Sequence, residues 1–460
     1  MSLWTSAAIA AACGGSASAE FACNGVSFDS REVDAGDLFI ALKGEATDGH
    51  RFIEAALARG AAGLLVSEPC AAPHVRVPDT MAALNALGAA ARDRSAATRI
   101  GVTGSVGKTG VKEALKEALS RFAPDAVHAS VKSYNNHTGV PLSLARMPAE
   151  SRFGVFEMGM NHAGELAALT QLVRPHIAIV TWVASAHREF FATEADIAAA
   201  KAEIFGGLPA GGTAIIPADN AHAPLLARAA RDAGARVVRF GRAADAEVRA
   251  EQVALHPDCS CVTARIHGEQ LIFKVGMAGA HWVNNALAVL AGVYAAGGDL
   301  ALAGLALAEM NGLPGRGRRL RVPAQHGQAI IIDEAYNANP ASMAASLAVL
   351  RDVAPARHGR RLALLGAMKE LGAHSDELHA GLAANVLEAG VAVAVLVGAE
   401  MQPLAEALKR RIDVRHVVDA DAALAELAPL IAADDVLLVK GSNSMRLARV
   451  IEALGQEALA

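Results

Sequence analysis

The sequence predicts an α/β protein of three domains, and three observations support this prediction. At 460 residues the chain is longer than one hydrophobic core usually organises. From about residue 81 apolar strands alternate with helices, which is typical of a parallel sheet with right-handed crossovers. A second alternation follows residue 312, and short β-like runs with Gly-Asp turns precede residue 80. We therefore expect domains at residues 1–80, 81–312 and 313–460.

The composition excludes several classes of protein. Hydrophobic residues make up 53% of the chain and charged residues 19%, which describes a globular protein rather than a disordered one. The 42 basic and 47 acidic residues form no blocks of one sign, so we expect no nucleic-acid partner. Five cysteines without a C-x-x-C pair argue against a disulfide framework and a zinc site. A reducing compartment fits best, and we expect a cytoplasmic protein.

Two apolar stretches could be mistaken for membrane or targeting segments. The N-terminus has the small residues of a signal-peptide cleavage site, but no Lys or Arg precedes Arg31. We predict a first amphipathic helix there, with a signal peptide as the minor alternative. The longest uncharged run, Val275–Asp299, carries His281 and two asparagines, so we predict a buried helix and no membrane span.

The predicted strands are short apolar runs, each followed by a helical pattern. In the central region they are "RIGVTG", "RFGVFEMG", "HIAIVTWV" and "GTAIIPAD". In the C-terminal region they are "AIIIDEAYNANP", "RLALLGAM", "VAVAVLVGA", "RHVV" and "DDVLLVKGS", after a Pro-Gly turn near Gly312. Ligands of such sheets bind at the carboxyl ends of the strands, so we expect the functional side chains to lie there.

The stretch Gly101–Gly110, "GVTGSVGKTG", has the setting of a phosphate-binding loop. A strand leads into a glycine-rich turn and then a helix, so backbone N–H groups would face phosphate oxygens. Lys108 would reach the terminal phosphates, and Thr109 would place its hydroxyl on Mg²⁺. A full Walker A motif needs glycine at position 102, where this chain has Val102. The glycine spacing also differs from a dinucleotide turn, which leaves a tight strand-to-helix turn as the unremarkable alternative.

A series of motifs resembles one known family over nearly the whole chain. The motifs occur in the family's order: "DSREVDAGDLFIALKG", "DGHRF", "TGSVGKT", "SYNNHTGVPLSL", "FEMGMNHAGEL", "SAHREFF", "AKAEIF", "GRGRRL", "DEAYNANPASM", "LGAMKELGAHSDELH" and "VKGSNSMRL". Together they resemble the ATP-dependent Mur ligases of peptidoglycan synthesis, and among them the MurF branch. The shortened loop from Thr103 to Thr109 is then a form of phosphate loop that this family uses.

The resemblance implies an architecture and a reaction. It implies an N-terminal UDP-substrate domain, a central P-loop ATPase domain with a parallel sheet, and a C-terminal Rossmann-like domain. ATP would phosphorylate the terminal carboxylate of UDP-N-acetylmuramoyl-tripeptide, and D-alanyl-D-alanine would attack the acyl phosphate. The product would be the UDP-muramoyl-pentapeptide, and we expect a monomer.

The catalytic and metal-binding residues follow from the same motifs. Lys108 would clamp the transferred phosphoryl group, and Glu157, at the end of the strand "RFGVFE", would hold the first Mg²⁺ with Thr109. The resemblance implies that Lys201 is carbamoylated and shares a second Mg²⁺ with His187. A carbamate would supply the oxygen and negative charge that an ammonium lacks. Without the resemblance, a structural histidine and a solvated lysine would be the expectation.

Further residues are expected to bind the nucleotide and the substrates. The phosphate loop predicts ATP contacts at Gly104, Ser105, Val106, Gly107, Lys108 and Thr109, and the resemblance implies further ones at Asn285, Arg316, Tyr336, Asn337 and Asn339. The resemblance places the UDP substrate on Ser30, Arg31, Lys43, Gly44, Asp48 and His50, the muramoyl portion on Asn135, Asn136 and Thr138, and the dipeptide near Lys440, Ser442 and Asn443. Ordinary turn chemistry or surface charge is the alternative for most of these side chains.

Two other functions stay open, as do some details of the site. One is another amide ligase of the same superfamily, such as the enzyme that adds the third residue or a folylpolyglutamate synthase. The other is a nucleotide-dependent switch, which would need neither Lys201 nor a UDP-binding domain. The chain departs from the family's usual residues at Trp182, Ala367 and Glu334, and at Pro217–Asp219. The sequence leaves open the third residue of the tripeptide.

Overall fold

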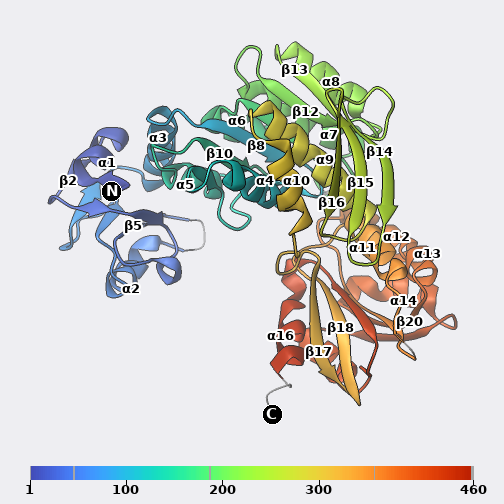
Figure 1. Cartoon of the computed structure of the whole chain (residues 1–460). Coiled ribbons are helices and arrows are strands. Elements are labelled where there is room, and N and C mark those ends of the chain that lie inside the picture. The colour runs from blue at the N-terminus through green and yellow to red at the C-terminus, as the bar shows by residue number, and fades with distance from the viewer. Residues whose placement is uncertain (1, 45–46, 186–187, 357, 457–460) are drawn as a thin grey trace.

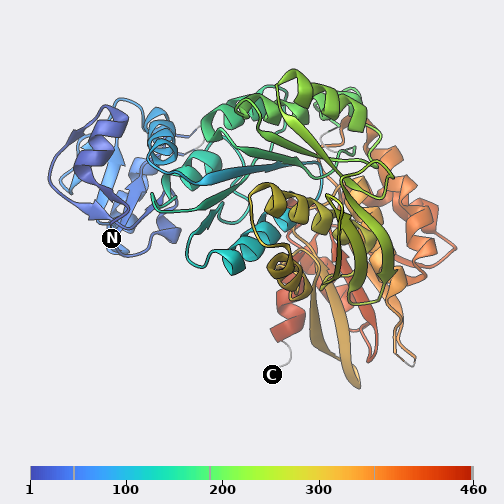
Figure 2. The same cartoon turned by 45° about the horizontal axis from the view of Figure 1, so that its top comes forward.

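The computed structural model describes residues 2–44, 47–185, 188–356 and 358–456. Over these residues the chain forms three α/β units in sequence order (Figure 1). Figures 1 and 2 both show the N-terminal unit at one end of the molecule and the C-terminal unit beside the central one. No helix of the described chain is long and apolar enough to cross a membrane.

The N-terminal unit is built on a sheet with strand order β2-β7-β6-β5-β4. Its strands are β2 (Ser16–Ala17), β4 (Gly25–Ser27), β5 (Asp37–Ile40), β6 (Gly63–Val66) and β7 (His74–Arg76), beside a ribbon of β1 (Trp4–Thr5) and β3 (Ala22–Cys23). Both β5 and β6 are buried along their whole length, because α1 (Ser6–Cys13) and α2 (Ile53–Ala58) help to cover the sheet. The first predicted helix is therefore present as α1.

Helix α3 (Thr80–Asp93) links the N-terminal and central units. Leu84 and Leu87 share a core with strand β5 and with Leu142 of α5 (Gly139–Ala145). Asp79 caps the helix by accepting from the backbone N–H groups of Met81 and Ala82. Because α3 packs on both units, the predicted boundary at residues 80 and 81 stays a prediction.

The central sheet has the order β16-β15-β14-β13-β12-β11-β8-β10-β9. Its strands from β8 to β13 are parallel and comprise β8 (Thr98–Thr103), β9 (Val127–Ala129), β10 (Phe153–Glu157), β11 (Ile177–Val180), β12 (Thr213–Pro217) and β13 (Arg236–Gly241). One core lies against α4 (Lys108–Phe122), α9 (Ala280–Ala295) and α10 (Leu300–Ala308), and the other lies against α6 (Glu165–Val173), α7 (Glu194–Ala202) and α8 (Ala223–Asp232). The predicted buried helix in the uncharged run is confirmed as α9.

An antiparallel extension of this sheet was missing from the sequence prediction. Strands β14 (Val248–Leu255), β15 (Ser260–Ile266) and β16 (Glu269–Val275) form a meander beside β13. Their apolar residues alternate with exposed ones, as expected for strands with one buried face. Ile272 of the edge strand β16 is 74% exposed.

The C-terminal sheet has the order β17-β18-β22-β19-β20-β21. Its strands are β17 (Arg318–Ala324), β18 (Gly327–Glu334), β19 (Arg361–Gly366), β20 (Val391–Val397), β21 (Asp413–Val417) and β22 (Val436–Lys440), and they include all five predicted runs. The helices are α11 (Pro340–Asp352), α12 (Ser375–Gly381), α13 (Ala383–Glu388), α14 (Gln402–Leu408), α15 (Ala420–Leu427) and α16 (Ala448–Gln456). Only β17 pairs antiparallel among these described strands.

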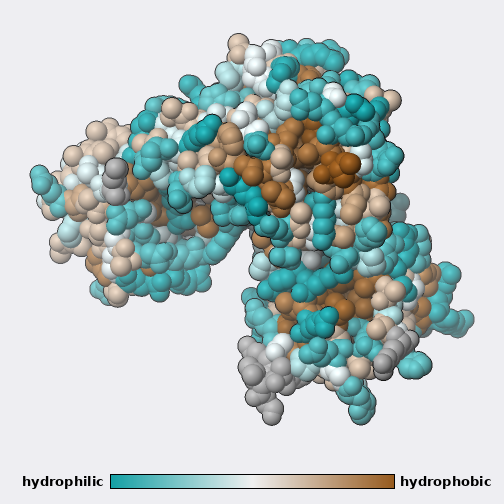
Figure 3. All heavy atoms as spheres, viewed as in Figure 1, coloured by the Kyte–Doolittle hydropathy of each residue, from teal (hydrophilic) through white to brown (hydrophobic). Residues whose placement is uncertain are grey.

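The topology places the ends of several strands near one another. Strand β8 lies between β10 and β11, so the segments that follow these three parallel strands open at the same edge of the sheet. Strands β18 and β22 likewise pair in parallel, with Glu334 opposite Lys440 at their carboxyl ends. Figure 3 shows an open gap between the N-terminal and C-terminal units below the central one.

Candidate active site

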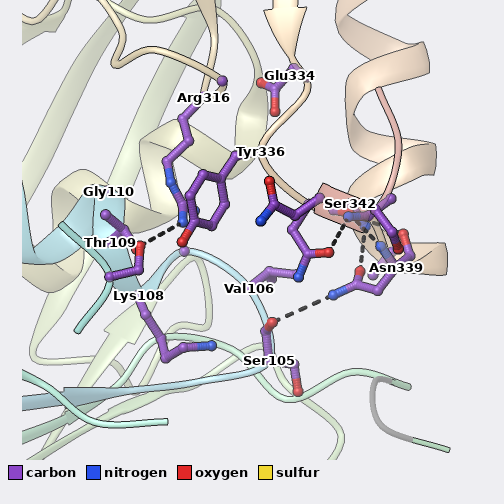
Figure 4. A pocket seen from close by; sticks show the side chains of 18 of the residues that line it. Ser105, Val106, Lys108, Thr109, Gly110, Arg316, Glu334, Tyr336, Asn339 and Ser342 are labelled. Carbon is purple, nitrogen blue, oxygen red and sulfur yellow. Dashed lines mark hydrogen bonds between the residues drawn. The ribbon is translucent and has the colours of Figure 1, made fainter. Parts of the chain in front are cut away.

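A pocket of about 660 Å³ lies where the central and C-terminal units meet. The phosphate loop, helix α9, the end of β18, the start of α11 and the segments after β19 and β22 all line it. Figure 4 shows Lys108 and Thr109 of the loop on one side, with Arg316, Tyr336 and Asn339 on the other. The pocket thus joins residues that lie more than 200 positions apart in the sequence.

The phosphate loop has the backbone that an anion site requires. Gly104 and Gly107 have φ angles of 154° and 87°, which residues other than glycine rarely adopt. A Cβ at Gly104 would lie 2.0 Å from the hydroxyl of Thr181, and one at Gly107 would lie 2.7 Å from Oδ1 of Asn285. Helix α4 begins at Lys108, so its first N–H groups point toward the pocket and can hold an anion.

Lys108 folds back over this loop. Its Nζ donates a 2.7 Å hydrogen bond to the carbonyl of Gly104. Burial lowers the pKa of Lys108, although Glu157 acts in the opposite direction. A phosphate group in the pocket would raise the pKa of Lys108 and favour its charged form, because opposite charges favour each other's ionised state.

Thr109 and Glu157 form a pair of oxygen ligands beside the loop. Oγ1 of Thr109 donates to Oε2 of Glu157 at 2.8 Å, and Nδ2 of Asn135 donates to Oε1 at 2.7 Å. Two neighbouring ligands of an octahedral Mg²⁺ are about 2.9 Å apart, since each lies about 2.0 to 2.1 Å from the ion. The two oxygens are therefore spaced as two ligands of one Mg²⁺ ion would be, and phosphate and water would supply the other ligands.

A metal held by protein ligands alone is a poorer fit. Within the described ranges no group of three or more His, Cys, Asp or Glu side chains is placed to hold a metal. A Mg²⁺ that is bound through one carboxylate, a hydroxyl and phosphate oxygens needs no such group.

Lys201 is buried near the end of α7, with 1% of its surface exposed. Burial, and after it the charge of Lys108, lowers the pKa of Lys201 well below its ordinary value. No carboxylate among the described side chains forms a salt bridge with it. His187, the predicted partner of Lys201, lies outside the described residues.

The predicted adenosine and phosphate contacts come together on the C-terminal side. The guanidinium of Arg316 lies 3.9 Å from the ring centre of Tyr336, and its Nη2 donates to Ser133 at 3.2 Å. Asn339 caps α11, and its Nδ2 donates to the carbonyl of Ser105 at 3.5 Å. Asn337 also lines the pocket, where its Oδ1 accepts from the N–H of Ala338. Tyr336 is 37% exposed, so part of this aromatic side chain is open to a ligand.

The ammonium group of Lys440 already contacts other protein groups, so it is not free to bind a dipeptide in this structure. Its Nζ donates to the carbonyl of Asn337 at 3.1 Å and lies 3.6 Å from Oε2 of Glu334. Ser442 accepts from the backbone N–H of Lys369, while Asn443 is exposed at the pocket wall. Of the three predicted dipeptide contacts, Asn443 therefore has the side chain that is most available.

The predicted UDP and muramoyl contacts lie elsewhere, apart from Asn135. None of the six N-terminal residues is among those that line the pocket: Ser30, Arg31, Lys43, Gly44, Asp48 and His50. Arg31 is exposed and pairs with Asp29, and His50 lies between Asp48 and Ser67. Just before α5, Oδ1 of Asn136 accepts from the N–H groups of Thr138 and Gly139. A substrate bound at these places would have to extend toward the pocket.

Several pocket residues escaped the sequence prediction. Ser133, His281, Trp282, Glu334, Lys369 and Glu370 line it. Ser133 stands two positions before Asn135 in the "SYNN" motif, which was the available signal. The sequence gives no sign that Trp282 lines the pocket, because it lies within an apolar helix. Only the fold brings its ring against Gly110 of α4.

Two of the four departures from the family's usual residues act through the backbone. The carbonyl of Trp182 accepts from the N–H of Ser105 at 2.8 Å, and that of Ala367 accepts from the N–H of Ser442 at 3.2 Å. These contacts do not depend on the side chain at either position. Glu334 differs, because its carboxylate faces the pocket and Lys440.

Comparison with known proteins gives the family. Models of the Mur ligase family match residues 23–127 (catalytic domain), 102–293 (middle domain) and 317–443 (glutamate ligase domain). The chain is 35% identical to the UDP-N-acetylmuramoyl-tripeptide–D-alanyl-D-alanine ligase of Escherichia coli, over 95% of this chain and 94% of that protein. It is 31% identical to the protein of the same name from Rickettsia prowazekii, over 98% and 99%.

Solved structures agree with these matches. A MurF structure from Acinetobacter baumannii superposes with a TM-score of 0.85 at 29% identity, covering 98% of this chain and 99% of that one. The MurF ligase of Thermotoga maritima in complex with ADP has a TM-score of 0.76 at 27% identity, covering 94% and 97%. The chain belongs to the Mur ligase family.

Proposed function

We propose that this protein is an ATP-dependent amide ligase that joins D-alanyl-D-alanine to UDP-N-acetylmuramoyl-tripeptide in peptidoglycan synthesis. The product is the UDP-muramoyl-pentapeptide. The observation that supports the reaction is a pocket that brings Lys108, Thr109 and Glu157 together with the stacked pair Arg316 and Tyr336. The names and coverage of the relatives support the choice of substrates.

The chain's own residues would bind and orient the reacting groups. The γ-phosphate of ATP lies over the loop, with Lys108 and the N-terminus of α4 facing the charge that develops during transfer. The carboxylate of the tripeptide attacks that phosphorus, ADP leaves, and an acyl phosphate forms. The amine of D-alanyl-D-alanine then attacks the acyl carbon, phosphate leaves, and the amine loses a proton. Arg316 contributes a second positive charge on the C-terminal side.

Thr109 and Glu157 would hold the first Mg²⁺, and a carbamoylated Lys201 with His187 would hold the second. The ions would neutralise charge on the phosphoryl and acyl oxygens. Support for the modification comes from the burial of Lys201 without a described carboxylate partner. A buried neutral amine can add CO₂, and the carbamate that results provides oxygen ligands.

The remaining assignments concern the substrates and the cell. We assign the six N-terminal residues to the UDP portion, and Asn135, Asn136 and Thr138 to the muramoyl portion. The three units correspond to residues 1–80, 81–312 and 313–460. We place the protein in the cytoplasm, a location with which the five free cysteines are consistent. We further propose that it is a monomer.

An amide-ligation assay tests this proposal against its alternatives. The purified protein is given ATP, a panel of UDP-muramoyl peptides and either D-alanyl-D-alanine or single amino acids, and the products are identified by mass. Only the tripeptide with the dipeptide should give a stoichiometric amide product and ADP. ADP release without either acceptor would favour a nucleotide switch, and ligation of a single amino acid would favour another member of the superfamily.

A further inference from the structure

The short segment Lys132–Asn135 contacts two functional regions at once. Successive side chains alternate between them: Lys132 and Tyr134 contact the N-terminal unit, whereas Ser133 and Asn135 contact residues of the ATP pocket. The segment follows β9 and precedes α5, so it has no strand or helix of its own to fix it. Its position depends on the partners of these four side chains and on backbone contacts, since Nζ of Lys112 donates to the carbonyl of Lys132 at 3.0 Å.

On the N-terminal side, both contacts converge on Glu32. The hydroxyl of Tyr134 donates to Oε2 of Glu32 at 2.8 Å, and Lys132 forms an ion pair with Oε1. The ring of Tyr134 also packs against Phe28, with 5.7 Å between the ring centres. Burial, and then the bond to Glu32, raises the pKa of Tyr134 to about 12, so the phenol remains a donor at neutral pH. Glu32 directly follows Arg31, a predicted contact of the UDP substrate.

On the ATP side, the segment completes a chain of hydrogen bonds. Nη2 of Arg316 donates to the Ser133 hydroxyl at 3.2 Å, and that hydroxyl lies 3.4 Å from Oγ1 of Thr109. Thr109 donates to one carboxylate oxygen of Glu157, and Asn135 donates to the other. The carbonyl of Asn135 also accepts from the N–H of Gly159 at 2.7 Å. Ser133 and Asn135 therefore hold both proposed Mg²⁺ ligands and the proposed phosphate arginine.

We propose that Tyr134 and Glu32 are positioning residues for the ligase reaction. Their hydrogen bond fixes the segment that carries Ser133 and Asn135, and so couples the N-terminal substrate region to Thr109, Glu157 and Arg316. This inference rests on the proposed function for the identity of the two substrates. A substrate that orders residues 30–32 also orders the segment, and the ATP pocket then loses less conformational freedom on binding.

Two conservative substitutions test the coupling. Tyr134→Phe removes the hydroxyl but keeps the ring against Phe28, and Glu32→Gln removes the charge that pairs with Lys132. Tyr294→Phe is the matched control, since Tyr294 stacks on His267 and does not line the pocket. Binding of a non-hydrolysable ATP analogue is measured by calorimetry for each protein, without and with saturating UDP-N-acetylmuramoyl-tripeptide.

The coupling factor is the dissociation constant of the analogue without the UDP substrate divided by that with it. It should exceed one in the wild-type protein and in the Tyr294→Phe control. In Tyr134→Phe and Glu32→Gln it should fall toward one. Their melting temperatures should stay close to that of the wild-type protein, which a general loss of structure would not allow. In turnover, kcat/KM for the UDP substrate should fall about threefold to tenfold, as expected for one partly exposed hydrogen bond to a charged group.

Two results would overturn the inference. One is a wild-type coupling factor of one, and the other is a coupling factor in both variants equal to that of the wild type. Either result could occur while the wild-type protein still makes the pentapeptide, so the inference can fail while the proposed function stands. Absence of the pentapeptide product from the wild-type protein would instead contradict the proposed function itself.

Discussion

Replacing Lys440 by Met should destabilise the C-terminal unit, because it leaves Glu334 without its opposite charge. The two side chains are 3% and 17% exposed, and Nζ lies 3.6 Å from Oε2. At an effective dielectric constant of about 20, this separation corresponds to roughly 5 kcal/mol of attraction before any solvation cost. Breaking a buried pair usually costs about 3 to 5 kcal/mol. Since Glu334 faces the pocket and can take up a proton or water, we expect about 3 kcal/mol.

The pH dependence of this loss has a definite sign. Burial already raises the pKa of Glu334 above its ordinary value of 4.5, and Lys440 opposes that rise. Without Lys440 the folded-state pKa is higher still, so the folded variant binds a proton that the unfolded chain releases. Stability of the variant therefore falls as the pH rises from about 4.5 through the raised pKa. The difference from the wild-type protein should be larger at pH 8 than at pH 5.

Differential scanning calorimetry at several pH values measures this effect. The variant should melt roughly 6 to 12 °C below the wild-type protein near neutral pH, for a unit of this size. The double variant Lys440→Met/Glu334→Gln should recover at least half of that loss, because no unpaired charge remains. A shift of less than 2 °C at every pH, or a double variant no more stable than Lys440→Met, would refute the reasoning.

Three further predictions concern the chemistry of the pocket. Lys108→Met should lower kcat by about 10²- to 10³-fold in a ligation assay while the melting temperature stays unchanged, because one preorganised positive group is lost; unchanged turnover would remove Lys108 from the site. Glu157→Gln should raise the Mg²⁺ concentration for half-maximal activity by about tenfold or more, since an amide oxygen is a weaker ligand for a hard cation, and an unchanged Mg²⁺ titration would contradict the metal assignment. Protein incubated with ¹³C-bicarbonate should show a carbamate carbon by NMR that Lys201→Ala lacks, and a spectrum common to both proteins would argue against the modification.

The strands and the phosphate loop could be predicted because their signals are local. The apolar run before Gly104 and the helix that begins at Lys108 are visible in a dozen neighbouring residues. The meander β14–β16 was missed, although its alternation of buried and exposed residues has the period of a strand. A strand–helix alternation indicates a parallel sheet, and residues 248–275 contain no crossover helix.

The pocket could be predicted only in part because its walls come from distant segments. Thr109 comes after β8 and Glu157 ends the adjacent parallel strand β10, so their proximity follows from topology. The environment of Lys440 does not follow from topology alone, because its pairing with Glu334 depends on the register between β18 and β22. Asn136 is predicted to contact substrate, and in the structure its Oδ1 accepts from the N–H of Gly139 at the start of α5. Asparagine serves both purposes, and the sequence pattern does not separate them.

The fate of one oxygen atom tests the proposed reaction most directly. The terminal carboxylate of UDP-N-acetylmuramoyl-tripeptide is labelled with ¹⁸O, and the protein is allowed to consume it with ATP and D-alanyl-D-alanine. If the carboxylate attacks the γ-phosphate, one labelled oxygen should leave with inorganic phosphate and the other should remain in the new amide. Mass spectrometry of the phosphate distinguishes the outcomes. Unlabelled phosphate, released alongside the pentapeptide, would contradict an acyl-phosphate intermediate and with it the roles assigned to Lys108, Thr109 and Glu157.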